Sequence, residues 1–283
     1  MKKFVFKSSI ILIPLLAAFI AVNCYQFFKY KTASEVYEAI ELCSKTSSYE
    51  GLVLGDSVAH QIFNSSTQNY SDRYLFATSN NAVTVFGNYL LLLKFYQNNP
   101  QLKEVKLFLR PQGFGSDINP TLFYQYVILP FYGKDYLAET VPEIKNKIEE
   151  IFTEKKVNSP FYRKLYYYLP VLRQKFLTER SATIKNESSD LSKINEIYFK
   201  KIISFCKDHD ISFEIKSSPL SNIYSKDDFL ELEKKLTSSF EASYFENYLD
   251  SILYFDKSEF IDEIHFTGEA LNKYLEIFMR EIL

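Results

Sequence analysis

The sequence predicts an α/β fold, a three-layer α/β/α sandwich around a mostly parallel sheet, on three observations. Apolar runs of strand length alternate with segments of helical periodicity. The first apolar run, residues 51–55, contains no polar side chain, as expected of a strand covered on both faces. The 283 residues are 47% hydrophobic and 24% charged, a composition typical of a globular domain and not of a disordered chain.

The first half of the chain supplies three predicted strands, at residues 51–55, 74–78 and 105–109, and three predicted helices, at residues 33–43, 58–63 and 89–96. Helix 33–43 places Val36, Ile40 and Cys43 on one side. Helix 58–63 follows the first strand directly. The run Asn98-Asn99-Pro100 ends helix 89–96, because asparagine favours turns and proline cannot continue a helix.

The strand-helix pattern returns after residue 190. An amphipathic helix at 194–206 and the turn Asp208-His209-Asp210 lead into a strand at 211–215, which ends before Pro219. A helix at 227–236 and a last strand at 252–255 follow. Residues 267–282 form the closing helix, with Glu269 in its first turn, where a negative charge stabilises the helix dipole.

The N-terminus contains a candidate membrane anchor. Residues 8–28 carry no charge and would span about 31 Å as a helix, enough to cross a bilayer core. Lys2, Lys3 and Lys7 precede this run, so the positive-inside rule places the N-terminus in the cytoplasm. A cleaved signal peptide is the alternative, although Asn23 makes a poor cleavage site.

We therefore expect a single-pass protein of the cell membrane with an extracytoplasmic domain. The expected organisation is an anchor at residues 1–32, a juxtamembrane helix and linker at 33–49, and the α/β domain at 50–283. Residues 120–183 interrupt the alternation and are rich in phenylalanine and tyrosine, which indicates a helical insertion. This insertion is either a cap that buries its own aromatic rings or a lid that contacts sugars or the membrane surface.

The net charge and the lack of metal or phosphate motifs indicate which partners are not expected. The net charge of −2 offers no global attraction for nucleic acid, so no nucleic-acid partner is expected. No Cys/His cluster or glycine-rich phosphate loop is present in the sequence, so we expect neither a metal nor a cofactor. Cys43 and Cys206 are expected to be buried free thiols, with a disulfide between them as the alternative.

Two short motifs at opposite ends of the domain carry chemistry. Gly55-Asp56-Ser57 ends the first strand, and Asp262-Glu263-Ile264-His265 precedes the last helix. A serine hydroxyl becomes a nucleophile when a histidine takes its proton and a carboxylate orients that histidine. The expected catalytic residues are therefore Ser57, His265 and Asp262. In the simpler interpretation, Asp56 or Ser57 merely caps a helix and Asp262 begins an ordinary turn.

These motifs resemble the first and last sequence blocks of the SGNH/GDSL hydrolase superfamily. The resemblance covers roughly residues 50–283 and implies a flavodoxin-like sheet with a Ser-His-Asp triad. It also implies an oxyanion hole made by the Ser57 amide, a glycine after the second strand and an asparagine after the third. Gly87 matches the glycine, and Asn81 is a second candidate nearby.

The third block departs from the family pattern. Where the resemblance implies the asparagine, the sequence has Ser116, and Gln112 or Asn119 are further candidates for the same donor. Arg110, at the carboxyl end of the third strand, either pairs with Asp117 or binds an anionic polymer. Asn81 and Arg110 are therefore the candidate binding residues.

The predicted function is that of an extracytoplasmic serine esterase or O-acyltransferase that works through an acyl-enzyme. By resemblance to anchored proteins that modify surface polymers, the expected substrate is an acylated or acceptor cell-surface glycan, and acetyl is the expected group. A membrane acyl-donor protein is a further expected partner. The alternative is a non-catalytic, membrane-tethered binding or assembly protein with the same fold, which the missing asparagine favours.

Overall fold

The computed structural model describes residues 11–21, 35–79, 84–115, 126–127, 129–131, 191–245 and 247–282. The chain divides into two units, residues 1–34 with 145–184 and residues 35–144 with 185–283. In the first unit, residues 11–21 are helical. Within the described ranges, no helix has both the length and the apolar character needed to cross a membrane. Most of the predicted anchor and of the predicted insertion lies outside these ranges.

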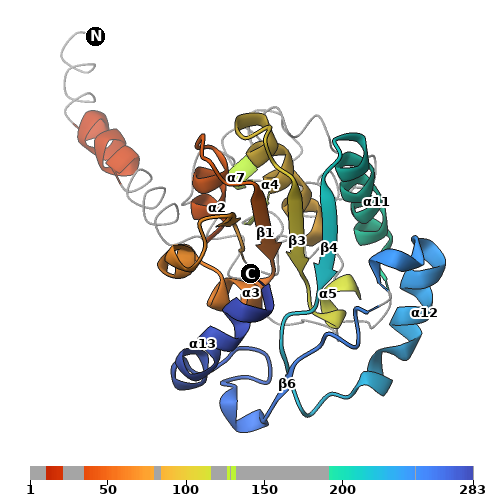
Figure 1. Ribbon diagram of the computed structural model, residues 1–283. Helices are drawn as coiled ribbons and strands as arrows, with labels where there is room; N and C mark the ends of the chain where they lie inside the picture. The colour runs from red at the N-terminus through yellow and green to blue at the C-terminus, as the bar shows by residue number, and fades with distance from the viewer. Residues whose placement is uncertain are drawn as a thin grey trace. The chain divides into compact units, whose positions relative to one another are not determined.

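The second unit is built on a four-stranded sheet with the order β2-β1-β3-β4 (Figure 1). All three pairs of neighbouring strands are parallel. The strands are β1 (Gly51–Gly55), β2 (Tyr74–Phe76), β3 (Glu104–Phe108) and β4 (Ser212–Lys216). Strand β1 is buried along its whole length, in agreement with its apolar sequence. The predicted α/β class and the central parallel sheet are therefore confirmed.

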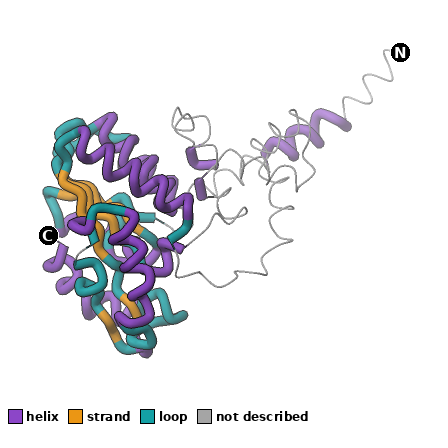
Figure 2. Tube along the Cα trace, turned by 90° about the vertical axis from the view of Figure 1, so that its right-hand side faces the viewer, coloured by secondary structure: helices purple, strands orange, loops and turns teal. Residues whose placement is uncertain are grey.

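Successive side chains of β1 point to opposite faces of the sheet, and helices pack on both faces. Val53 belongs to one core cluster together with residues of α3 (Ser57–Ile62) and α13 (Gly268–Ile282). Leu52 and Leu54 point to the other face of the sheet. Helix α4 (Thr84–Asn98) contacts β1 and packs against α2 (Glu35–Cys43) and α11 (Lys193–Asp208). Figure 2, turned by 90°, shows long helices running beside the strands.

The folded unit begins earlier in the chain than Glu50. Helix α2 buries Val36, Ala39, Ile40 and Cys43 and packs against α4. The polar joint that follows α2 is held by Asn99, whose side-chain oxygen accepts a hydrogen bond from the Ser47 amide at 2.6 Å. Residues 35–49, expected as a linker, are thus part of the packed α/β unit.

Residues 252–255 were predicted to form the last strand, and the structure has a shorter strand in a different sheet from β1–β4. Only Tyr254–Phe255 are extended, as β6, and they pair with β5 (Leu220–Ser221) in a separate two-stranded parallel sheet. The physical reason is the packing of Phe255, whose ring contacts the rings of Phe266, Tyr274 and Phe278. These aromatic contacts hold the segment against α13.

The remaining described elements are short or continue a predicted helix. Predicted helix 227–236 starts as a 3-10 turn and continues as an α-helix to Ser239. The remaining described helices and 3-10 turns are η1 (Ser65–Tyr70), α5 (Pro111–Gly115), α7 (Leu129–Phe131), η6 (Lys226–Phe229), α12 (Leu230–Ser239), η7 (Ala242–Tyr244) and η8 (Lys257–Glu259).

Gly55, the last residue of β1, permits the close approach that brings α3 over the sheet. A Cβ at this position would lie 2.5 Å from the Cβ of Ala59 and 2.9 Å from the carbonyl oxygen of Phe108. We expect Gly55→Ala to lower the free energy of unfolding by about 1–3 kcal/mol, as overpacking does. Gly268→Ala is the matched control, because nothing lies within 4 Å of its Cβ. Urea unfolding measures both, and equal stability of the two variants would contradict the expectation.

Candidate active site

Ser57 is the first residue of α3, directly after the end of β1. Asp56 caps this helix: its Oδ1 atom accepts hydrogen bonds from the amides of Val58 at 3.0 Å and Ala59 at 3.1 Å. Within the described residues, no hydrogen bond occupies the amide of Ser57. A free amide at a helix N-terminus is suited to bind an oxyanion. Capping by Asp56 therefore leaves one donor for a ligand beside the serine hydroxyl.

The carboxylate of Asp56 joins the ends of three parallel strands. Its Oδ2 atom accepts hydrogen bonds from the backbone amide and the Nε atom of Arg110, at 3.0 and 3.3 Å, after β3. Its Oδ1 atom also accepts the hydroxyl of Ser218, after β4, at 2.9 Å. Asp56 and Arg110 are 1% and 3% exposed. Together these contacts hold the Ser57 turn rigidly at the carboxyl edge of the sheet.

The structure shows a partner of Arg110 that the sequence analysis did not predict. The guanidinium pairs with Asp56, and Asp117, one of the expected partners, lies outside the described residues. The Arg110 side chain is 4% exposed, and its described contacts hold Asp56 in place. No sequence pattern pointed to Ser218, which lies 162 residues from Asp56.

The predicted triad residues are in contact. The Nε2 atom of His265 lies 3.0 Å from the Oγ atom of Ser57, across 208 residues of sequence. The Nδ1 atom of His265 lies 2.9 Å from the Oδ2 atom of Asp262. This arrangement fits an imidazole that donates Nδ1–H to the carboxylate and accepts a proton from the serine at Nε2.

The loop that carries His265 is organised by Asp262. Its Oδ1 atom accepts hydrogen bonds from the amides of Ile264 at 3.2 Å and His265 at 2.8 Å. Glu263, between them, has a φ of 68°, a left-handed conformation that this tight turn requires. One carboxylate thus shapes the turn through Oδ1 and orients the imidazole through both oxygens, which lie 3.1 and 2.9 Å from Nδ1 of His265.

Asp262 is held in its ionised form. Partial burial raises the pKa of its carboxyl group, but hydrogen bonds from the side chain and the backbone of His265 lower it by more, so the pKa lies below its ordinary value. Asp262 therefore carries a negative charge at neutral pH. A negative charge in this position is suited to stabilise an imidazolium.

Gly87, one of the other predicted oxyanion donors, lies inside α4 and is buried. Asn81 and Ser116 lie outside the described residues. The Ser57 amide is therefore the candidate donor that the described part of the site places beside the serine hydroxyl.

The remaining histidines and cysteines have structural partners. The Nδ1 atom of His60 lies 3.1 Å from the Thr78 carbonyl oxygen, and His209 contacts the hydroxyl of Tyr96. Cys43 and Cys206 are buried free thiols, as predicted. Burial raises the pKa of Cys206 to about 12 and that of Cys43 still higher, so neither thiol is a ready nucleophile.

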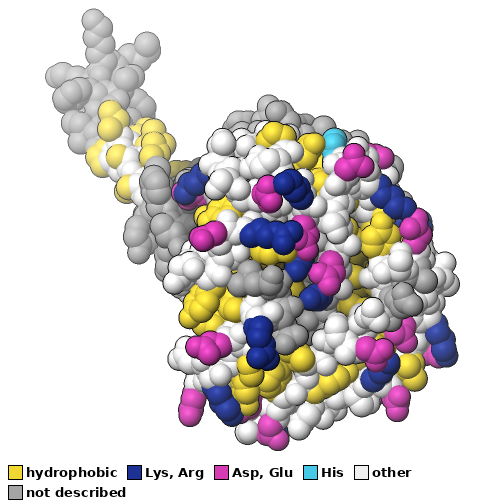
Figure 3. Space-filling view, in the orientation of Figure 1, with side chains coloured by type: hydrophobic (Ala, Val, Ile, Leu, Met, Phe, Trp, Pro, Cys, Tyr) yellow, Lys and Arg dark blue, Asp and Glu magenta, His cyan; other side chains and the backbone are white. Residues whose placement is uncertain are grey.

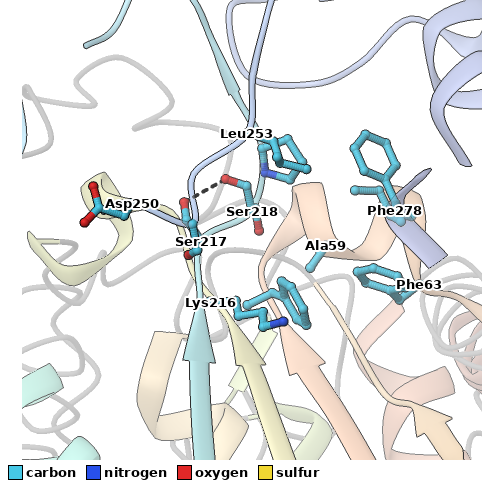
Figure 4. Close-up of a pocket in the computed structure, with 12 residues that line it drawn as sticks. Ala59, Phe63, Lys216, Ser217, Ser218, Asp250, Leu253 and Phe278 are labelled. Atoms are coloured by element: carbon cyan, nitrogen blue, oxygen red, sulfur yellow. Dashed lines mark hydrogen bonds between the residues drawn. The ribbon is translucent and has the colours of Figure 1, made fainter. Parts of the chain in front are cut away.

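A cavity of about 240 Å³ lies beside the site, between α3, α13 and the ends of β3 and β4 (Figure 4). Ala59 lines it from α3, Phe63 from the residue after α3, and Phe278 from α13. At 100° per residue, Ala59 lies on the face of α3 opposite to Ser57. The cavity therefore does not hold a ligand against the serine hydroxyl, and we do not assign it to the substrate.

Surface charge is mixed in sign. On the face drawn in Figure 3, basic and acidic side chains are interspersed, without a large region of one sign. Among the described residues, no group of three or more His, Cys, Asp and Glu side chains is placed to hold a metal ion.

Comparisons with known proteins leave the family open. No protein-family model and no curated protein matches the sequence. A solved structure described as "a putative platelet activating factor from Streptococcus pneumonia" covers 93% of this chain and 99% of its own, at 11% identity and a TM-score of 0.38. A similarity this low carries no functional argument, so the function is inferred below from the geometry of the site.

Proposed function

We propose that this protein is a serine esterase or O-acyltransferase of the SGNH/GDSL type, with Ser57 as the nucleophile. The observation that carries the proposal is the continuous series of contacts from Ser57 Oγ to His265 Nε2 and from His265 Nδ1 to Asp262. The finer features of the fold, a three-layer flavodoxin-like sandwich, belong to the same proposal.

In the proposed reaction, His265 takes the proton of Ser57 as the serine oxygen attacks the carbonyl carbon of an ester. Charge develops on the carbonyl oxygen, and the free amide of Ser57 donates a hydrogen bond to it. One such donor contributes roughly 3 kcal/mol to lowering the barrier. His265 then returns the proton to the departing alcohol, which leaves an acyl group on Ser57.

A second hydroxyl compound completes the cycle. Water as the acceptor releases the acid and makes the protein an esterase, whereas a sugar hydroxyl makes it an acyltransferase. We propose a cell-surface glycan as the substrate or acceptor, acetyl as the acyl group and a position outside the membrane, by resemblance to anchored proteins of this type. A membrane protein that donates the acyl group is part of the same proposal.

A fluorophosphonate probe tests the nucleophile. We expect the full-length protein in detergent to be labelled at Ser57, because the probe reacts with serines that a neighbouring base activates. Ser57→Ala should abolish labelling, while Ser65→Ala, which removes an exposed serine in η1, should leave it unchanged. Circular dichroism shows whether each variant is folded. Folded wild-type protein that takes up no label would contradict the proposal and favour a non-catalytic binding protein.

Acetate release then separates the two reactions. With an aryl acetate as donor, an esterase releases acetate at the same rate with or without a glycan. An acyltransferase instead yields acetylated glycan, detected by mass spectrometry, at the expense of free acetate.

A further inference from the structure

Gln61 joins the helix that carries Ser57 to the loop that carries His265. It lies four residues after Ser57 on α3, so the two side chains project from the same face of the helix. Its side-chain oxygen accepts a hydrogen bond from the amide of Phe266 at 3.0 Å, and its side-chain nitrogen donates to the carbonyl oxygen of Phe266 at 3.3 Å. Both the oxygen and the nitrogen of the Gln61 side-chain amide therefore bond to the backbone of Phe266, the residue next to His265.

Few other hydrogen bonds join α3 to the loop of His265. Among the residues that the structure describes, the hydrogen bonds between α3 and residues 256–267 are those of Gln61 with Phe266 and that of Ser57 with His265. The loop has further hydrogen bonds within itself, such as that from the Ile261 amide to the His265 carbonyl oxygen at 2.8 Å. It is also bonded to α13, where Lys273 and Tyr274 donate to Glu259 at 2.8 and 3.0 Å, and to Asn222, which accepts the Lys257 amide at 3.2 Å. None of these bonds reaches α3, so Gln61 is the described side chain that ties the backbone of the loop to the helix of Ser57.

Burial alone does not fix the catalytic geometry. The side chain of His265 is 33% exposed and that of Asp262 is 54% exposed, so solvent borders much of the pair. Proton transfer from Ser57 requires a distance near the observed 3.0 Å and a correct angle, which a half-exposed loop loses when it shifts. Phe266, in contrast, is 1% exposed and its ring stacks on Phe260, which makes its backbone a firm point of attachment.

We propose that Gln61 is a positioning residue, which holds the His265 loop at the distance from Ser57 that proton transfer requires. It acts through the backbone of Phe266 and does not contact the reacting atoms. The inference rests on the proposed function of Ser57 and His265, and it adds to that function a residue outside both sequence motifs.

The chain contains a matched control for the test. Gln68, in η1, makes the same two-sided link: its nitrogen donates to the Tyr74 carbonyl oxygen at 2.7 Å, and its oxygen accepts from the Phe76 amide at 2.9 Å. Both glutamines are half-buried. Gln61→Leu removes two hydrogen bonds to backbone, and Gln68→Leu removes three, the third being to the Ser71 carbonyl oxygen at 3.4 Å. Gln68 holds β2 and not the His265 loop. Comparison of the two variants separates loss of positioning from loss of stability.

We expect Gln61→Leu to slow fluorophosphonate labelling and to lower kcat for an aryl ester by about 10- to 100-fold, because a displacement of about 1 Å has an effect of this size. KM should stay within about twofold, since binding is not the step that Gln61 serves. Gln68→Leu should keep kcat within about twofold of wild type, at a similar melting temperature to Gln61→Leu. Equal kcat in the two variants would overturn the proposal.

A spectroscopic measurement distinguishes failure of this inference from failure of the proposed function. In the wild type, the Nδ1 proton of His265 is held by Asp262, so the imidazole is expected in a single tautomer, visible in ¹H–¹⁵N spectra of the ring. Gln61→Leu should mix the tautomers, and Gln68→Leu should not. If the wild type takes up no probe yet Gln61→Leu shifts these resonances, the positioning role stands and the enzymatic proposal falls. Unchanged resonances in Gln61→Leu would overturn the positioning role.

Discussion

Asp262→Asn is expected to lower kcat/KM for an aryl ester by about 10⁴-fold without unfolding the protein. The asparagine oxygen can still accept the amides of Ile264 and His265, so the turn is kept. What is lost is the negative charge beside the Nδ1 atom of His265. Without it, the imidazole is no longer held in the tautomer that accepts the serine proton, and the imidazolium is not stabilised. Steady-state kinetics measure the loss.

Asp256→Asn is the matched control for this experiment. Asp256 lies on the same loop and caps η8, where its Oδ1 atom accepts the Ser258 amide at 2.9 Å, but it does not contact His265. We expect kcat/KM of the Asp256→Asn variant to stay within about twofold of the wild-type value. If Asp262→Asn also stays within tenfold of wild type, Asp262 is not the residue that orients the base.

The same carboxylate has a defined effect on stability as a function of pH. Because the pKa of Asp262 is lowered on folding, the ionised side chain stabilises the native state above the ordinary aspartate pKa of about 3.9. This stabilisation is lost as the pH falls through the lower, native-state pKa. The stabilities of wild type and Asp262→Asn should therefore converge towards acid pH, which urea unfolding at several pH values measures.

Asp56→Ala is expected to lower the free energy of unfolding by about 3–5 kcal/mol, the effect of removing one partner of a buried ion pair. The substitution leaves the Arg110 guanidinium, itself 3% exposed, without its carboxylate. It also removes the cap of α3 and the acceptor of the Ser218 hydroxyl. Chemical denaturation measures the change.

A double-mutant cycle with Arg110→Met separates the ion pair from the helix cap. If the buried charge dominates, Arg110→Met recovers much of the stability lost in Asp56→Ala, because no unpaired charge then remains. Asp72→Ala, which removes an exposed aspartate near the start of β2, should change the stability by less than about 0.5 kcal/mol. A loss in Asp56→Ala as small as that of Asp72→Ala would rule out a structural role for the Asp56 network.

The predictions from sequence agree best with the structure where residues close together in the sequence decide the local conformation. The apolar run of β1 and the polar turn after it predicted a buried strand followed by α3, and the structure has both. Asp262 and His265 are three residues apart, so the turn that joins them is a local property. Segment 252–255 was predicted less well, because its partner depends on the aromatic rings that pack around Phe255.

The sequence by itself determined the central parallel sheet, the place of Ser57 at the end of its first strand and the pairing of His265 with Asp262, because periodicity and turn chemistry act over a few residues. Only the tertiary structure decided that His265 meets Ser57 across 208 residues, that Arg110 and Ser218 hold Asp56, and that Gln61 holds Phe266. These contacts depend on which strand ends and loops share one edge of the sheet. That arrangement is set by packing of the whole unit and leaves no pattern in any one segment.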